Sequence, residues 1–279
     1  MKRETKCIYF WCVIIFSYCL SFAQTNINVS KKLDSLWSVY NNDVQPVNMR
    51  LKAIHTIAWS LRNNNPDTSI ILAQQQLQLA KETKQRKYVG KAFTTIGVSY
   101  RNKGDYPKAL ENLLSALKVF EETDNKEGLG LCYNQIGHVY NAQSNYSKAL
   151  EYYLKALKVL EGADKQWIGD CYNNLGNIHE KQSDLTKALD YYLKSLKISE
   201  GVGDKQGEGE CYNNIGNVYE TQIDYLKALE YYEKALRIWK EYNNNKGIKY
   251  CYIKISILCG KLKDSKMSKK YNDSAKSVK

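Results

Sequence analysis

The side chains most often used in catalysis are scarce in this 279-residue chain. It has only three histidines, His55, His138 and His179, and none is paired with another at metal-ligand spacing. The motifs HExxH and GxSxG and a phosphate-binding glycine loop are absent. The segment Gly207-Glu208-Gly209 is better interpreted as a flexible helix start than as a phosphate cradle. We therefore expect no catalytic residue, no metal site and no cofactor.

The eight cysteines do not form a tidy disulfide framework. Three lie within the first 23 residues, which leaves an odd number in the rest of the chain. Four of the remaining five recur at intervals of 39 or 40 residues, each directly before a tyrosine: Cys132, Cys171, Cys211 and Cys251. Because they occupy one equivalent position, we expect them to be small buried residues rather than disulfide partners or metal ligands.

The same interval governs most of the sequence. Residues 170–200 and 210–240 are identical at 17 of 31 positions without a gap. Each unit carries an aromatic residue, then Ile or Leu, Gly, and Tyr or His, followed by Ala-x3-Tyr/Leu-x2-Ala/Ser. Four units show this pattern clearly, around Gly97, Gly137, Gly176 and Gly216. A weaker unit precedes them and a degenerate one follows.

These spacings predict two packed helices in each unit. The first motif places its apolar residues on one helical face, and the second motif does the same on the next helix. A small residue at the crossing should let the two backbones approach closely. Residues suited to cap the second helix precede it in each clear unit: Asp105, Asn145, Asp184 and Asp224. Since a helix pair cannot cover its own apolar surface, each unit needs a neighbour.

This pattern resembles the tetratricopeptide repeat. The resemblance implies an all-α solenoid, a right-handed superhelix of helix-turn-helix repeats that binds proteins or peptides. The long unit is similar to those of kinesin light chains, Pins-type adaptors and bacterial peptide-pheromone receptors. The segments 33–37 and 65–69 also resemble exported sensor regions of Bacteroidetes signalling proteins, in which an output domain commonly follows.

The predicted organisation has three parts. Residues 1–23 form a signal peptide, 24–49 a leading helix and 50–279 the repeat array. Within the array we expect a divergent repeat at 50–90, clear repeats at 91–130, 131–169, 170–209 and 210–249, and a degenerate terminal repeat at 250–279. The signal peptide rests on Lys2, Arg3 and Lys6 before an apolar run, with small residues at Ser21 and Ala23.

In the resembling fold, the first helices line a concave surface, and the residues around each glycine point into it. The expected binding residues on that surface are Asn134, His138, Asn173, Asn177, Glu180, Asn213, Asn217, Glu220 and Arg101. A side-chain amide offers one acceptor and two donors, so such a column could clamp the backbone of an extended peptide. The alternative interpretation is that these asparagines belong to the helix packing of the repeat. The scarcity of concave cations argues against a carboxylate clamp.

The formal net charge of +12 is concentrated near the end, where residues 261–279 hold seven lysines and two aspartates. We interpret this run as solvated rather than as a nucleic-acid site, because aromatic residues are not interleaved with it. The function expected is a non-catalytic scaffold for a protein or peptide, exported to the periplasm or secreted. Two alternatives remain: the sensory part of a larger signalling protein with a kinase, cyclase or transcription output, and a passive spacer. An uncleaved membrane anchor is the alternative to a cleaved signal.

Overall fold

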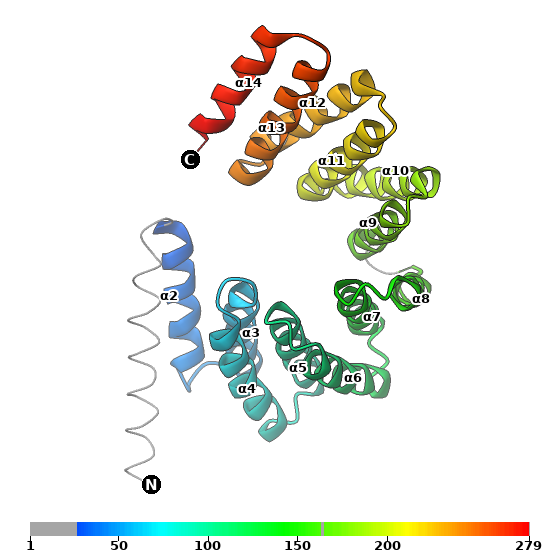
Figure 1. The fold of residues 1–279 in the computed structure, drawn as a ribbon. Coiled ribbons are helices and arrows are strands. Elements are labelled where there is room, and N and C mark those ends of the chain that lie inside the picture. Colours follow the sequence, from blue (N-terminus) through cyan, green and yellow to red (C-terminus); the bar gives the residue numbers. More distant parts are fainter. Residues whose placement is uncertain (1–26, 163–164, 279) are drawn as a thin grey trace. The chain divides into compact units, whose positions relative to one another are not determined.

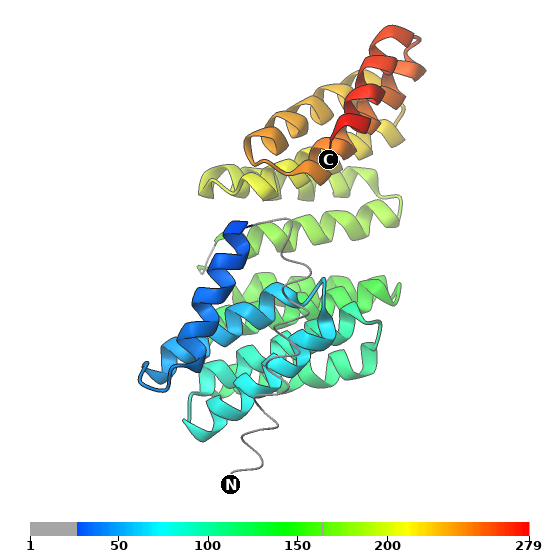
Figure 2. The ribbon, with the colours of Figure 1, turned by 90° about the vertical axis from the view of Figure 1, so that its left-hand side faces the viewer.

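The computed structural model describes residues 27–162 and 165–278, and every regular element in those ranges is a helix. The predicted signal peptide lies outside the described residues. The chain divides into two compact units, Met1–Gly128 and Leu129–Lys279. Each unit consists of successive antiparallel helices joined by tight turns (Figures 1 and 2).

Unit 1 is built from one leading helix and two helix pairs. The elements are α2 (Ile27–Asn41), α3 (Val47–Leu61), α4 (Pro66–Glu82), α5 (Arg86–Asn102) and α6 (Tyr106–Glu122). Its core contains Ile54, Ile57, Leu72 and Ile96, and the apolar side of α2 packs against it. None of the described helices, here or in unit 2, is long and apolar enough to cross a membrane.

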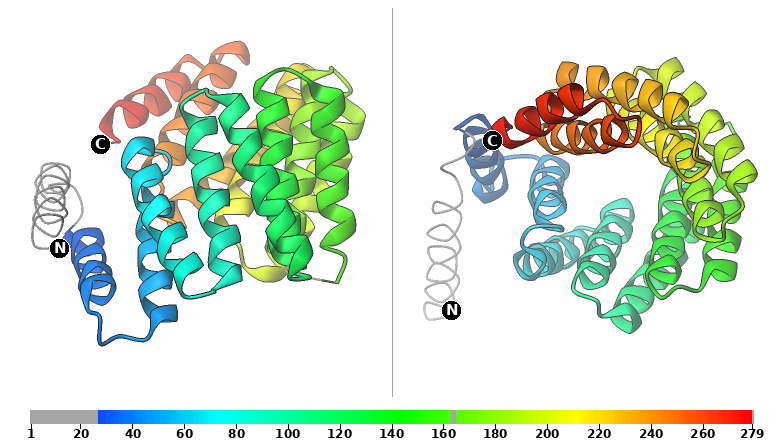
Figure 3. Two further views of the ribbon diagram at one scale, coloured as in Figure 1. Left: turned by 90° about the horizontal axis from the view of Figure 1, so that it is seen from below. Right: turned by 45° about the horizontal axis from the view of Figure 1, so that its top comes forward.

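Unit 2 continues the alternation after the boundary within α7 (Lys126–Ala142). The following elements are α8 (Tyr146–Val159), α9 (Lys165–Lys181), α10 (Leu185–Val202), α11 (Lys205–Thr221), α12 (Tyr225–Glu241), α13 (Asn245–Lys261) and α14 (Ser265–Ser277). Helices α9, α11 and α13 form one layer, and α10 and α12 form a second layer behind it (Figures 1 and 3). Gly207-Glu208-Gly209 lies within the start of α11 rather than in a loop between helices, because the helix begins at Lys205 and Asp204 caps it.

The predicted helix caps are confirmed. The side chains of Asp105, Asn145, Asp184 and Asp224 each accept a hydrogen bond from the backbone N–H three residues later, at 3.2 Å. Each bond satisfies one of the N–H groups that a helix leaves without a partner at its first turn. The repeating acidic or amide residue therefore fixes where every second helix begins.

The repeat cysteines are also placed as expected. Cys132, Cys171, Cys211 and Cys251 are at most 1% exposed, and all four are free thiols. Burial raises the pKa of the Cys171, Cys211 and Cys251 thiols to about 12. A thiol held so firmly in its protonated form is a poor nucleophile and metal ligand. These cysteines act as small core residues.

The repeat glycine faces a side chain of the second helix. A Cβ atom on Gly176 would lie 2.6 Å from Tyr192 Cε1, and one on Gly137 would lie 2.5 Å from Tyr153 Cε1. The nearest atoms thus belong to an aromatic ring of the second helix rather than to its backbone; only at Gly97 is a backbone oxygen, that of Ala109, among the closest three. The glycine makes room for a buried tyrosine. At Gly137 and Gly176, the space left by the missing side chain is filled by this tyrosine ring.

The basic run near the end is not a free tail. Residues 265–277 form α14, which packs on α13 through Met267, Tyr271 and Ala275. The lysines of α14 remain exposed, as expected for a solvated face. Lys261, however, points toward α11 and makes an ion pair there.

Candidate functional site

The predicted binding residues fall on the first helices of their repeats. Helix α7 carries Asn134 and His138; α9 carries Asn173, Asn177 and Glu180; α11 carries Asn213, Asn217 and Glu220. All eight belong to unit 2. Arg101 lies near the end of α5 in unit 1, where its guanidinium donates to Asn102 Oδ1. Asn134 on α7 is only 3% exposed, whereas the predicted residues on α9 and α11 are half-buried.

A ladder of amide hydrogen bonds joins successive repeats. Asn174 Nδ2 donates to Asn134 Oδ1 over 2.9 Å, and Asn214 Nδ2 donates to Asn173 Oδ1 over the same distance. In the following repeat the donor is a thiol instead of an amide: Cys251 Sγ lies 3.2 Å from Asn213 Oδ1. Each repeat therefore uses the carbonyl oxygen of the predicted asparagine to hold the helix of the following repeat.

The donors of this ladder, Asn174 and Asn214, were not among the predicted site residues. A sequence signal for them exists, because both stand second in an Asn-Asn doublet that recurs after 40 residues. Neighbouring positions on a helix point about 100° apart, so the two amides of a doublet can serve different partners. In both doublets, the second amide reaches back to the preceding repeat.

Buried tyrosines hold the deeper part of the surface. The Tyr192 hydroxyl lies 2.5 Å from Glu180 Oε2 and 2.8 Å from Asn177 Oδ1. In the next repeat the Tyr232 hydroxyl lies 2.6 Å from Asn217 Oδ1 and 3.0 Å from Glu220 Oε2. Burial, reinforced by the neighbouring carboxylates, raises the pKa of both tyrosines far above the usual range. Each hydroxyl therefore keeps its proton and acts as a donor.

The earlier repeat replaces the asparagine by histidine. The Tyr153 hydroxyl is 3.2 Å from His138 Nδ1, and the His138 ring packs edge-on against the Tyr153 ring. The Tyr153 ring packs against Gly137 in the same way as the Tyr192 ring packs against Gly176. In three successive repeats, then, a tyrosine from the second helix crosses the glycine and orients the polar residue that follows it on the first helix.

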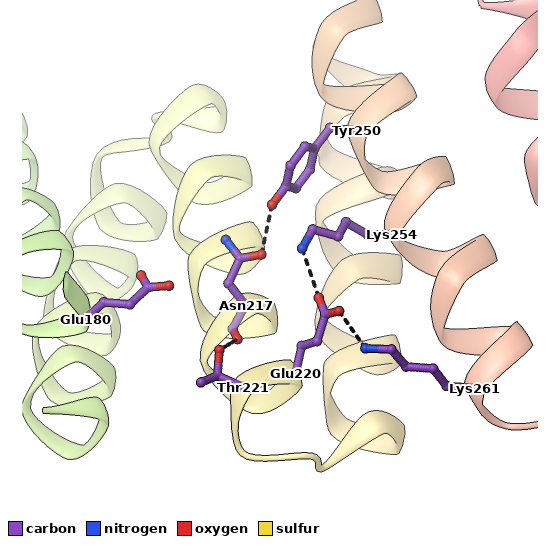
Figure 4. Close-up of a pocket in the computed structure, with 7 residues that line it drawn as sticks. All are labelled: Glu180, Asn217, Glu220, Thr221, Tyr250, Lys254 and Lys261. Carbon is purple, nitrogen blue, oxygen red and sulfur yellow. Dashed lines mark hydrogen bonds and ion pairs between the residues drawn. The ribbon is translucent and has the colours of Figure 1, made fainter. Parts of the chain in front are cut away.

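An open hollow of about 490 Å³ lies between α9, α11 and α13 (Figure 4). It is lined by Glu180, Asn217, Glu220, Thr221, Tyr250, Lys254 and Lys261. Glu180 points into it from α9, and the remaining residues come from α11 and α13 (Figure 4). The walls are thus polar side chains of three consecutive repeats.

A three-residue ion cluster forms one side of this hollow. Lys254 Nζ lies 2.9 Å from Glu220 Oε2, and Lys261 Nζ lies 3.1 Å from Glu220 Oε1. Burial favours the neutral form of Glu220, but the hydrogen bonds from the two ammonium groups outweigh it and lower the pKa of the carboxyl. Sequence reasoning missed both lysines, because the terminal repeat lacks the glycine from which positions were counted. Both lysines are paired with the same carboxylate, and Glu220 balances only one of their two positive charges.

The hydrogen bonds within the protein use the side-chain oxygen atoms of the asparagines rather than their side-chain nitrogen atoms. The oxygens of Asn173, Asn177, Asn213 and Asn217 all accept hydrogen bonds from the protein. Among residues 27–162 and 165–278, no partner is found for the Nδ2 groups of these four asparagines. The surface therefore presents a column of oriented N–H donors.

A comparison with protein families matches residues 88–162 and 167–241 to the model described as tetratricopeptide repeat. The two matches cover more than half of the chain and contain all of the site described above except the residues of α13. The chain belongs to the tetratricopeptide repeat family. The predicted family and the all-α solenoid fold are thereby confirmed. Repeats of this kind are generally non-catalytic scaffolds for protein binding. No curated protein matches the chain.

Several solved tetratricopeptide-like structures share this fold at low identity. The structure of BtubC from P. vanneervenii is 20% identical, with a TM-score of 0.68, and the alignment covers 77% of this chain and 91% of that one. A Rap protein complexed with Competence and Sporulation Factor is 15% identical, with the same TM-score, over 90% and 69% of the two chains. The signal transduction ATPase PH0952 from Pyrococcus horikoshii, which has a tetratricopeptide repeat sensor, is 15% identical with a TM-score of 0.64; the alignment covers 84% of this chain and 36% of the ATPase.

Proposed function

We propose that the chain is a non-catalytic scaffold that binds an extended peptide segment on the first-helix surface of unit 2. The observation that carries this proposal is the column of N–H donors on Asn173, Asn177, Asn213 and Asn217. An extended peptide has unpaired backbone carbonyl groups at regular intervals, and donors at fixed positions can bind them whatever the side chains are. The hollow beside Glu180 and Lys254 would then receive a polar side chain of the same peptide.

Replacing Asn173 and Asn213 by aspartate tests the proposal. The carboxylates of N173D/N213D still accept from Asn214 Nδ2 and Cys251 Sγ, but they have no N–H to donate. We expect the Tm to change little and peptide affinity to fall by roughly five- to a hundredfold, since two bonds of about 0.5–1.5 kcal/mol each are lost. The probe is a fluorescent peptide selected on the wild-type chain from a random-sequence library of about nine residues.

Asn112→Asp is the matched control, because this half-buried amide on α6 donates only to the Lys108 carbonyl of its own helix. Asn174→Asp is a second control with the opposite expected effect: it removes a donor of the ladder, so the Tm should fall. Equal affinity of wild-type and N173D/N213D for the selected peptide would contradict the clamp. Failure of the library to enrich any peptide on the wild-type chain would contradict the proposed function itself.

The proposal includes action outside the cytoplasm. It is supported by the basic start and apolar run of residues 1–23 in the sequence. We expect the exported protein to begin at Gln24, which mass spectrometry of the intact chain can establish. A chain that retains Met1 and remains in the membrane fraction would instead indicate the uncleaved anchor.

A second candidate is the sensory part of a signal-transduction protein with a kinase, cyclase or transcription output. What favours it is the shared fold with the repeat array of PH0952, described as a sensor. The reading frame beyond residue 279 and its neighbouring genes decide between the two candidates, because only the sensor requires an output domain there or on a partner.

A further inference from the structure

One side of α13 carries two exposed isoleucines. Ile253 and Ile257 are 43% and 46% exposed, and their i, i+4 spacing places them next to each other on the helix surface. Lys249 lies one turn and Lys246 two turns before Ile253 on the same side, and both are also exposed. We call these four residues the end face. The opposite side of α13, with Cys251, Ile255 and Leu258, is buried in the core.

In the two preceding repeats, the residues at the equivalent positions are half-buried and are contacted by the first helix of the next repeat. Ile253 and Ile257 stand 40 residues after Asn213 and Asn217. Those two asparagines contact α13, through Cys251 Sγ at 3.2 Å and the Tyr250 hydroxyl at 2.8 Å. In the repeat before, Asn173 and Asn177 are contacted by Asn214 of α11. The end face therefore has the shape of a surface on which helices pack in this array.

The chemistry of this surface changes at α13. Amides occupy both positions in α9 and α11, whereas α13 has isoleucine at both. Within unit 2, as far as the structure describes it, no helix covers them. Exposure of two adjacent isoleucines to water is unfavourable, and a partner that covers them would lower the free energy.

The charge around the isoleucines is positive. Helix α13 has four lysines and no acidic residue. Lys254 and Lys261 are paired with Glu220, but Lys246 and Lys249 have no ion pair among the described residues. On the adjacent α14, Lys266, Lys269 and Lys270 are exposed as well. A partner that covers the isoleucines therefore comes close to the ammonium groups of Lys246 and Lys249, which lie on the same side of α13.

We propose that the end face binds an amphipathic α-helix of another protein, with apolar residues at i, i+4 spacing and acidic residues beside them. Its apolar side would cover Ile253 and Ile257, and its carboxylates would approach Lys246 and Lys249. A second copy of the chain is disfavoured, because pairing two end faces would bring their lysines together. A membrane surface is disfavoured because only a narrow strip of α13 is apolar and exposed. This site is separate from the asparagine column.

The test uses the full chain and a synthetic fluorescent helix of about 20 residues, with leucines at i, i+4 and glutamates beside them. We expect binding that weakens as salt is added. I253S/I257S should raise the Kd at least about tenfold, because the apolar contact is lost. K246E/K249E should raise it by a similar factor at low salt and remove most of the salt dependence. Peptides with lysine in place of glutamate should not bind.

Leu154→Ser and Leu193→Ser are matched controls, because these leucines are 50% and 43% exposed on α8 and α10. They should leave the Kd unchanged, and so should N173D/N213D, which distinguishes this site from the N–H donors of the proposed peptide site. The proposal is overturned if the acidic helix does not bind or if I253S/I257S binds it as the wild type does. It is equally overturned if only phosphatidylglycerol vesicles bind the end face, or if sedimentation shows a dimer that I253S/I257S dissociates.

Discussion

Gly176 leaves space for one aromatic ring, and that space links the core of a repeat to its polar surface. The Tyr192 ring passes across the glycine, is fully buried, and ends with its hydroxyl between Asn177 and Glu180. A side chain at position 176 would push the ring away and with it the hydroxyl that orients both residues. The same arrangement recurs at Gly216 and Tyr232. A residue without a side chain thus controls the geometry of the site.

Gly176→Ala should therefore destabilise the protein by about 1–3 kcal/mol, the usual range for overpacking a core. Gly201→Ala is the control, because Gly201 lies in α10 and nothing is within 4 Å of a Cβ atom there. That change should stabilise the protein by roughly 0.5–1 kcal/mol, since alanine is the better helix former. Urea unfolding of both variants measures the difference, and shifts of the same sign would disprove the role assigned to Gly176.

His55 in unit 1 gives the stability a pH dependence. Burial, helped by the charges of Lys91 and Arg62, lowers the pKa of this histidine to about 4. The unfolded chain takes up the proton near pH 6.5, before the folded chain does, so stability should decrease as the pH falls from about 6.5 to 4. The loss is at most about 3 kcal/mol. His55→Phe should flatten this slope in unfolding measured at pH 7 and pH 5; an unchanged slope would contradict the assignment.

At the scale of elements, the turn between the two helices of a repeat is the same in the four clear repeats. Its second-last residue has a positive φ: 80° at Gly104, 58° at Ser144, 63° at Ser183 and 64° at Ile223. The next residue caps the second helix. The left-handed conformation suits glycine and is unfavourable for a β-branched residue. Helix α11 is thus joined to α12 by a strained residue.

Ile223→Gly should stabilise the protein by about 1 kcal/mol, because it removes this strain and Ile223 is 70% exposed, so little packing is lost. Gly104→Ile introduces the same strain in the equivalent turn of unit 1 and should destabilise by a similar amount. Thermal unfolding of the two variants gives the comparison. A lower Tm for Ile223→Gly would mean that the isoleucine makes a stabilising contact.

For the whole molecule, stability is distributed along the chain rather than held in one core. Each core cluster in unit 2 joins a few consecutive helices, as with Tyr192 and Ile215 in one cluster and Tyr232 and Ile255 in the next. The stability of such an array is approximately a sum of repeat and interface contributions. Helices with neighbours on both sides are therefore held by two interfaces, and terminal helices by one.

Amide hydrogen exchange should follow this order. In unit 2 we expect the strongest protection in α9 to α13, each of which packs between two neighbouring helices, and weaker protection in α14, which is the last helix. In unit 1, α2 should exchange faster than α5. Binding of the acidic helix to the end face should slow exchange in α13 and α14 selectively. Uniform protection from residue 30 to 278 would show instead that the chain unfolds in a single cooperative step.

The local sequence was sufficient to predict the repeat, its helices, their caps and the burial of the cysteines. Each depends on spacing along one helix or on a residue next to a helix end, such as Asp184 before α10. The family and the solenoid fold follow from the same spacing, because a helix pair with two apolar faces must pack on its neighbours.

Contacts between repeats could not be predicted in this way. That Asn174 reaches back to Asn134, that Lys254 and Lys261 enclose Glu220, and that Tyr192 fills the space over Gly176 each depend on how two helices are placed in three dimensions. A periodic pattern shows which face of a helix is apolar, but it does not show which atom of the next helix each polar group meets. Only the tertiary structure decides that the side-chain oxygens of Asn173, Asn177, Asn213 and Asn217 accept hydrogen bonds from the protein, while their Nδ2 groups have no partner among the described residues.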